Sequence, residues 1–95
     1  MEPSQVTRID EQFRRALALH QGGHFQEALN IYVAILRADP KHFDSLHLLG
    51  VVMLQVGNPQ KSVELIELAL QLNPNVSAAC NNLANAYKEL GLFDK

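Results

Sequence analysis

The sequence has little of several features that mark common functional classes. It contains one cysteine, so no disulfide can form within the chain and an oxidising compartment is not indicated. Lysine and arginine are scattered and outnumbered by acidic residues, eight against ten, and form no basic patch of the kind that binds nucleic acid. No apolar run approaches the length of a membrane span, and the N-terminus lacks the apolar stretch of a secretory signal. We therefore expect an intracellular, cytoplasmic protein that binds neither nucleic acid nor membrane.

Residues that carry catalysis or bind metals are also sparse. His20 and His24 are four apart, but two glycines interrupt the helix that would bring their imidazoles together. His42 and His47 have no carboxylate at a spacing known for metal sites, and surface or N-cap roles are favoured for them. Cys80 is expected to be a buried, inert thiol. The sequence predicts no catalytic residue, no cofactor and no metal site.

What the sequence does contain is an internal echo at an interval of 34 residues. Such a period is typical of stacked copies of one supersecondary unit, none of which buries its apolar face alone. We expect the repeated glycines to adopt positive φ where the first helix of each copy ends, and the repeated small residues to lie where two helices cross, so that side chains larger than alanine would clash. The residues concerned are Gly23, Gly57 and Gly91; Ala16, Gly50 and Ala84; and Pro40 and Pro74.

Five segments have helical periodicity, and each is bounded by residues that interrupt helices. Asn58 is expected to cap the fourth helix, with Pro59 at its first position. Helices joined by connections this short pack antiparallel to their neighbours. The segments are 9–21, 25–38, 43–56, 59 to about 73, and 77–90.

The pattern resembles the tetratricopeptide repeat, a helix–turn–helix unit of the same length. In the second copy the matching residues are Leu46, Leu49-Gly50, Met53, Gly57, Ala69 and Pro74. The resemblance implies an all-α, antiparallel helix–turn–helix solenoid of about two and a half repeats and five helices. Its parts would be a tail at 1–8, repeats at 9–42 and 43–76, and the first helix of an incomplete third repeat at 77–95.

Four residues depart from the family pattern. Gln12 and Arg15 stand at positions that are usually apolar, and we interpret them as the solvated outer face of an N-terminal cap. Pro59 and Ser62 replace the usual aromatic and small apolar residues, which should loosen the second turn slightly.

A narrower similarity concerns the strings LHLLGVVMLQVGNPQKSVELIELALQLNPN and NNLANAYKELGLFDK. They are similar to the repeats that precede bacterial O-linked N-acetylglucosamine transferase-like catalytic domains. Such repeats also precede methyltransferases and other bacterial enzymes. The narrower resemblance implies an N-terminal adaptor of a larger protein, with the catalytic part absent from this chain.

In a tetratricopeptide solenoid the first helix of each copy lines a concave surface, and helical periodicity selects the residues that face it. Those positions combine amide, imidazole and apolar groups, which suits a peptide main chain because an amide both donates and accepts hydrogen bonds. The predicted peptide-binding residues are Asp44, His47, Val51, Gln55, Asn81, Asn82, Asn85 and Lys88. The other inward positions are Asp10, Phe13, Arg14, Leu17, His20, Leu48 and Ala78.

Asn82 and Asn85 are the favoured contacts. The resemblance to the glycosyltransferase repeats implies that asparagines here form a ladder that holds an extended peptide. The alternative is that both are ordinary solvated amides, since the other copies lack them. The paired Lys, Arg and Asn of the carboxylate-clamp form of the family are not matched, so acidic chaperone tails are not the expected ligand.

The leading hypothesis is a non-catalytic protein-interaction scaffold that binds a peptide or partner protein in the concave groove. One alternative is the substrate-selecting adaptor of a larger glycosyltransferase-like enzyme. Another is a homo-oligomerisation module, because apolar residues at the end of the chain are expected to be partly uncovered and to drive self-association. These residues are Leu83, Ala86, Leu90, Leu92 and Phe93.

Overall fold

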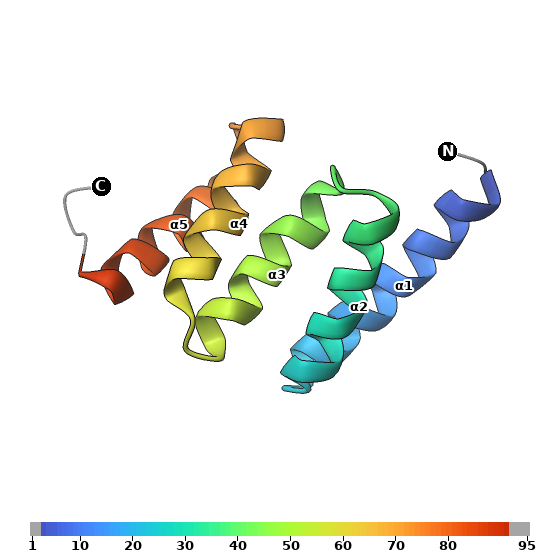
Figure 1. Ribbon diagram of the computed structural model, residues 1–95, viewed down its shortest axis with the longest axis horizontal. Coiled ribbons are helices and arrows are strands. Elements are labelled where there is room, and N and C mark those ends of the chain that lie inside the picture. Colours follow the sequence, from blue (N-terminus) through green and yellow to red (C-terminus); the bar gives the residue numbers. More distant parts are fainter. Residues whose placement is uncertain (1–2, 92–95) are drawn as a thin grey trace.

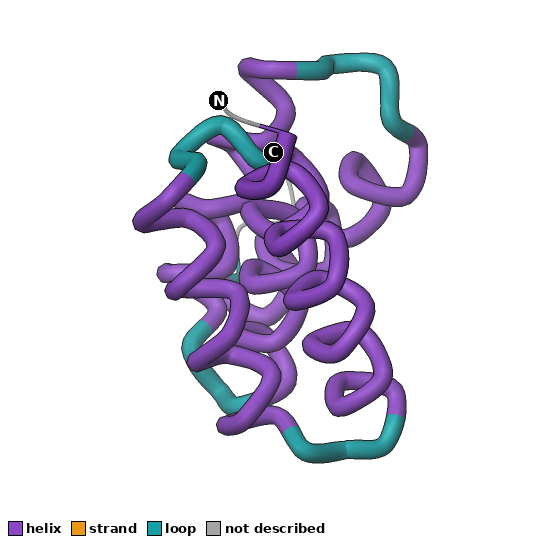
Figure 2. The backbone as a smooth tube through the Cα atoms, turned by 90° about the vertical axis from the view of Figure 1, so that its right-hand side faces the viewer, coloured by secondary structure: helices purple, strands orange, loops and turns teal. Residues whose placement is uncertain are grey.

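The computed structural model describes residues 3–91, with side chains from residue 8 onward, and contains in that range five α-helices and no strand (Figure 1). The helices are α1 (Pro3–Gln21), α2 (Phe25–Ala38), α3 (Phe43–Gln55), α4 (Pro59–Leu72) and α5 (Ser77–Leu90). Sequence neighbours pack together along the whole array, and α5 also touches α3. The connections lie at the ends of the helices (Figure 2). The predicted fold class is confirmed.

The helix boundaries follow from local chemistry, and the start of α1 differs most from the prediction. Helix α3 ends at Gln55, one residue before its predicted limit. The bounds of α2 and α5 are as predicted. Helix α1 begins at Pro3 rather than Ile9, so residues 3–8 of the predicted tail are helical. Proline fits the first turn of a helix because its missing N–H would have no partner there, and no helix-breaking residue follows before Ile9.

The turns within the two helix pairs each contain a glycine with positive φ and have the same hydrogen bonds. Gly23 and Gly57 have φ of 83° and 90°, as the sequence predicted for these positions. The next backbone N–H donates to a carbonyl five residues earlier, from His24 to Leu19 at 2.8 Å and from Asn58 to Met53 at 2.7 Å. This pattern is the Schellman motif, which satisfies carbonyls at a helix C-terminus. Gly91 closes α5 with φ of 78°.

Helices α3 and α4 pack tightly against each other at Gly50. A Cβ at this position would lie 2.6 Å from Cγ1 of Ile66 and 3.3 Å from the carbonyl oxygen of Ser62. Even alanine is therefore too large, a tighter restriction than the sequence indicated. One repeat earlier, the positions of Gly50 and Ser62 hold Ala16 and Ala28, both completely buried. The two buried alanines of the first helix pair thus correspond to a glycine and a serine in the second pair.

The main core cluster extends from α1 to α4, and its largest fully buried side chain is Tyr32. Burial raises the pKa of Tyr32 to about 12. Ser62 is also completely buried, and its Oγ has no hydrogen-bond partner among the described residues. No helix in the described part of the chain is long and apolar enough to cross a membrane.

Three predictions about α5 were wrong, and two of them fail for one reason. Cys80 and Ala84 are exposed, although Cys80 was expected to be buried and Ala84 to lie at a close crossing. Their counterparts one repeat earlier, Leu46 and Gly50, are buried between α3 and its neighbours. Within residues 3–91 no helix follows α5 to cover the same face. Ala86, expected to be uncovered, is completely buried on the opposite side of the helix.

The other apolar residues near the end of the chain differ in their exposure to solvent. Leu83 is half-buried, and Leu90 is 36% exposed. Leu92 and Phe93 lie outside the described residues.

Candidate peptide-binding surface

Helices α3 and α5 carry all eight predicted peptide-binding residues, and the two helices are in contact. In Figure 1, α2 and α4 lie in front of α1 and α5. We call the eight residues together the first-helix surface. Asp44, Gln55, Asn81, Asn85 and Lys88 are exposed, Val51 and Asn82 are half-buried, and His47 is buried.

His47 and Asn82 are paired across the two copies. Asn82 Nδ2 donates to His47 Nε2 at 2.8 Å, which requires a neutral imidazole with its proton on Nδ1. Burial lowers the pKa of His47, and the nearby carboxylate of Asp44 opposes this in part. The ring also lies against Phe43, with 6.0 Å between the centroids. The pair therefore favours the neutral, accepting form of the imidazole near neutral pH.

A second imidazole connects α1, α2 and α3. His20 Nε2 lies 2.7 Å from Gln55 Oε1, and His20 Nδ1 lies 3.2 Å from the Tyr32 hydroxyl. Because the amide oxygen only accepts, His20 donates from Nε2, and in its neutral form it accepts from Tyr32 at Nδ1. The ring also meets Phe25 edge-on, with 5.8 Å between the centroids. This chain of contacts connects the exposed Gln55 at the end of α3 to α1 and α2.

Both contacts join a histidine to an amide 35 residues later, one residue beyond the repeat interval. All four side chains were predicted to lie at concave positions, but each was expected to be available to bind a ligand by itself. The structure brings them together as two pairs between neighbouring copies. A search for polar residues one position beyond the repeat would have found both pairs.

Apart from the half-buried Val51, the unpaired remainder of the first-helix surface is polar and of mixed charge. Asn81, Asn85 and Lys88 follow one side of α5 and are exposed, as is Asp44 at the start of α3. Such a surface offers donors and acceptors without a strong field of either sign. Among the described residues no group of three His, Cys, Asp or Glu side chains is placed to hold a metal ion.

Two other histidines stand at helix starts, and one of them, His42, has a local role in capping and packing. His42 is the N-cap of α3, where its Nδ1 accepts from the backbone N–H of Ser45 at 3.2 Å. Its ring also packs against Phe13 of α1, with 5.5 Å between the centroids. Phe13, one of the predicted inward positions, is therefore partly taken up in packing between copies.

Comparison with known proteins identifies a repeat family for part of this chain. Residues 43–76, which hold α3 and α4, match the model of the tetratricopeptide repeat. The chain is 33% identical over 88 residues to the probable UDP-N-acetylglucosamine--peptide N-acetylglucosaminyltransferase SEC of Arabidopsis thaliana, covering 90% of this chain and 9% of that protein. It is 34% identical over 71 residues to the UDP-N-acetylglucosamine--peptide N-acetylglucosaminyltransferase of Caenorhabditis elegans, covering 75% of this chain and 6% of that protein.

Solved structures agree on the fold. The second TPR of Spaghetti (RPAP3), bound to the HSP90 peptide SRMEEVD, superimposes with a TM-score of 0.88 at 16% identity. The likeness covers 98% of this chain and 88% of that one. By fold the chain is therefore a tetratricopeptide-repeat solenoid, and by sequence its residues 43–76 match the tetratricopeptide repeat family.

Proposed function

We propose that this chain is a non-catalytic binding module whose first-helix surface holds an extended peptide segment of a partner protein through its main chain. The observation that carries the proposal is the row of exposed Asn81, Asn85 and Lys88 on α5, beside an Asn82 held in place by His47. An amide that is held in place, as that of Asn82 is, binds a peptide at lower entropic cost than a freely rotating one. The tetratricopeptide-repeat fold, which in the Spaghetti structure accompanies a bound peptide, supports a protein ligand.

The test begins with selection of binders from a displayed library of random heptapeptides. A selected peptide, made synthetically with blocked ends, is titrated by calorimetry into the protein. The variant Asn82→Ala with Asn85→Ala should bind roughly tenfold more weakly, because each lost hydrogen bond contributes about 0.5–1.5 kcal/mol. A peptide with N-methylated main-chain amides should also lose affinity if the main chain is what the asparagines hold.

Two variants serve as controls. Glu64→Gln alters an exposed residue on α4 and should leave binding unchanged. His47→Leu removes the acceptor that supports Asn82 without removing any exposed amide, so it should weaken binding by less than the double variant. Equal affinity of the double variant and the unaltered protein would place the peptide site elsewhere.

A second candidate is favoured by the relatives. Both curated relatives named above act on peptides with UDP-N-acetylglucosamine, and the chain spans less than a tenth of either. We propose as an alternative that the first-helix surface selects protein substrates for a larger glycosyltransferase-like enzyme. Sequencing the reading frame on both sides of the gene segment tests this directly, since a frame with no transferase domain overturns it.

A third candidate is self-association through α5, favoured by its exposed Cys80 and Ala84 face. Sedimentation velocity over a wide range of concentration under reducing conditions should then show a growing fraction of larger species. A constant monomer would contradict this role without affecting the peptide-binding proposal.

A further inference from the structure

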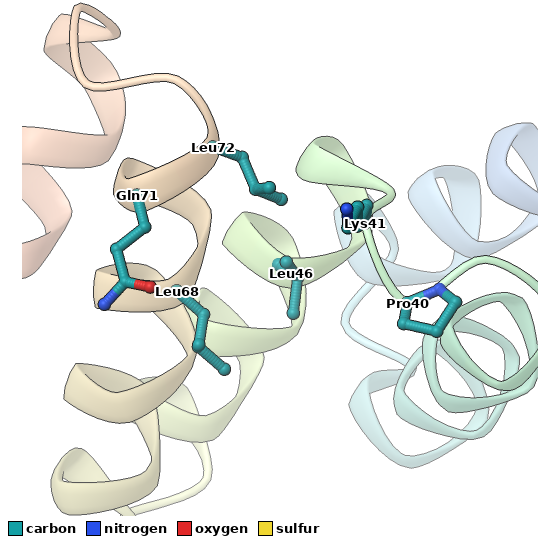
Figure 3. Close-up of a pocket in the computed structure, with 6 residues that line it drawn as sticks. All are labelled: Pro40, Lys41, Leu46, Leu68, Gln71 and Leu72. Atoms are coloured by element: carbon teal, nitrogen blue, oxygen red, sulfur yellow. The ribbon is translucent and has the colours of Figure 1, made fainter.

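A cavity of about 200 Å³ shares no residue with the first-helix surface. It lies between α4 and the turn that joins α2 to α3, above the side of α3 (Figure 3). Its lining residues are Pro40, Lys41, Leu46, Leu68, Gln71 and Leu72. The cavity is therefore formed by three segments of the chain rather than by one helix face.

The walls of the cavity are unusually apolar for an exposed surface. Leu68 and Leu72 are 47% and 43% exposed, whereas Leu46 at the base is only 6% exposed. In Figure 3 the leucine side chains of α4 extend toward α3 and the turn. Two large aliphatic side chains on one helix are thus partly exposed to water and face a buried leucine on another. This arrangement is typical of a binding pocket rather than of a closed core.

The two leucines of α4 that line the cavity differ from the residues of the first copy. One repeat earlier, the positions of Leu46, Leu68 and Leu72 hold Gln12, Ala34 and Ala38, which are half-buried or exposed. The alanines complete α2 without difficulty, so the fold does not require leucine at these positions. The two leucines of α4 therefore need an explanation outside the core.

The size of the cavity restricts its occupant. A cavity of roughly 150 Å³ accommodates a benzene ring, whereas sites for whole small ligands begin at about 300 Å³. A specific protein dimer buries about 1,200 Å² or more, far beyond what this recess offers alone. One leucine-sized or phenylalanine-sized side chain of a short segment fits these limits.

The rim adds a charge preference. Lys41 is exposed and has no carboxylate within 4.0 Å of its Nζ among the described residues. The nearby Asp39 is engaged differently, because its Oδ1 accepts from the backbone N–H of Lys41 at 3.2 Å. The exposed Gln71 supplies an uncharged polar group on the opposite wall. A partner carboxylate next to the apolar side chain would complement Lys41.

We propose that this cavity is a second docking site, which takes one bulky apolar side chain of a partner peptide whose carboxylate lies against Lys41. The site goes beyond the main-chain recognition proposed for the first-helix surface. It would add side-chain specificity to a scaffold, since an anchor residue in a fitted pocket contributes much of the binding energy of a peptide.

The experiment uses methyl-labelled leucine in the intact protein and three small probes, followed by NMR. N-acetyl-leucine carries both the apolar side chain and a carboxylate, N-acetyl-leucinamide lacks the charge, and N-acetylglycine lacks the side chain. N-acetyl-leucine should shift the methyl signals of Leu46, Leu68 and Leu72 with a dissociation constant on the order of millimolar. The amide should bind roughly twofold to fivefold more weakly, as an exposed ion pair predicts, and N-acetylglycine should not shift these methyls.

Variants separate the two parts of the site. Leu68→Ala with Leu72→Ala restores the residues found in the first copy, keeps good helix formers, and should abolish the binding of N-acetyl-leucine. Leu90→Ala, which removes an exposed leucine on α5, is the matched control and should not change binding. Lys41→Gln should remove the preference for the acid over the amide.

Several results would overturn the proposal. The absence of saturable shifts at the three leucines in the unaltered protein would exclude the site, whatever the variants do. Equal shifts at Leu90 would mean non-specific contact. Methyl shifts that depend on protein concentration without any probe would mean that a second copy, not a peptide, occupies the cavity.

Discussion

At the scale of single residues, glycine is required at Gly50 and Gly57 for different physical reasons. Gly57 adopts φ of 90°, but an added Cβ would meet no atom within 4 Å. Gly50 is helical, but an added Cβ would overlap Ile66. At Gly57 the backbone conformation alone disfavours a side chain, whereas at Gly50 the neighbouring side chain of Ile66 excludes one.

Substitution by alanine should distinguish these two cases. Gly57→Ala should lower the free energy of unfolding by about 1–2 kcal/mol, because a Cβ is unfavourable in the left-handed region. Gly50→Ala should lower it by about 1–3 kcal/mol through overpacking. Urea unfolding in an Ile66→Ala background is the test. The cost of Gly50→Ala should fall there while that of Gly57→Ala stays the same, and equal costs in both backgrounds would contradict the assignment.

His47 gives the stability of the protein a dependence on pH. Burial lowers the pKa of His47 in the folded state, so the unfolded chain binds more protons as the pH falls through the ordinary histidine range. The stabilisation is complete above the unfolded pKa and is lost as the pH falls below it. The free energy of unfolding should therefore decrease between about pH 7.5 and about pH 5.5. His47→Gln should flatten this slope, whereas His24→Gln, at an exposed histidine, should leave it intact.

At the scale of elements, α2 and α4 begin with different caps. Asn58 caps α4, and its Oδ1 accepts from the backbone N–H of Lys61 at 3.2 Å. His24 stands at the same position before α2 and makes no side-chain cap bond. The N–H groups of the first turn of α4 thus have a partner that those of α2 lack.

Asn58→Ala should lower the free energy of unfolding by about 1 kcal/mol, the usual value of an N-cap hydrogen bond. His24→Ala is the matched control and should cost much less, since only an exposed contact of 3.8 Å to Glu27 is lost. Thermal unfolding followed by circular dichroism measures both. A larger loss from the His24 variant would show that capping does not govern these helices.

The sequence predicted correctly those helix boundaries that are set by neighbouring residues in the chain. Asn58 with Pro59 and the glycine turns are short-range signals, and the structure has them where they were expected. The early start of α1 at Pro3 was missed because proline ends a helix when it lies in the interior but is favourable in the first turn. The exposure of Cys80 was missed because burial depends on a neighbouring helix and not on the residue's own position in the pattern.

The candidate site was predicted only as a set of positions. Helical periodicity placed His47 and Asn82 on first helices, but their hydrogen bond depends on how adjacent copies are rotated against each other. The pocket beside Lys41 was missed for a related reason. Leu68 and Leu72 fit the apolar stripe of an ordinary helix, and only the structure shows that they remain half open.

At the scale of the whole molecule, stability should be greatest in the middle of the array. Helix α3 packs against α2, α4 and α5 and is linked to α1 through Gln55 and His20. In a solenoid each unit is stabilised by its nearest neighbours, so the units with neighbours on both sides are the last to open.

Hydrogen exchange of the native protein provides the measurement. Amides of α3 should exchange most slowly, followed by those of α4 and α2, and those of α1 and α5 should exchange fastest. Uniform protection across the five helices would mean that the array opens as one cooperative unit. Gly50→Ala should speed exchange in α3 and α4 more than in α1, because its overlap lies between those two helices.

The tight packing of Gly50 against Ile66 limits how such an array can evolve by recombination. A crossover at the turn between copies keeps Gly50 with Ile66, and it keeps Ala16 with Tyr32 at the same two positions of the first copy. A crossover inside a copy would join the helix that carries Ala16 to the helix that carries Ile66, where a Cβ would lie 2.6 Å from Cγ1 of Ile66 and force the helices apart. The heritable building block is therefore the intact helix pair, and shuffled libraries of this protein should yield folded chains mainly when they are cut between pairs.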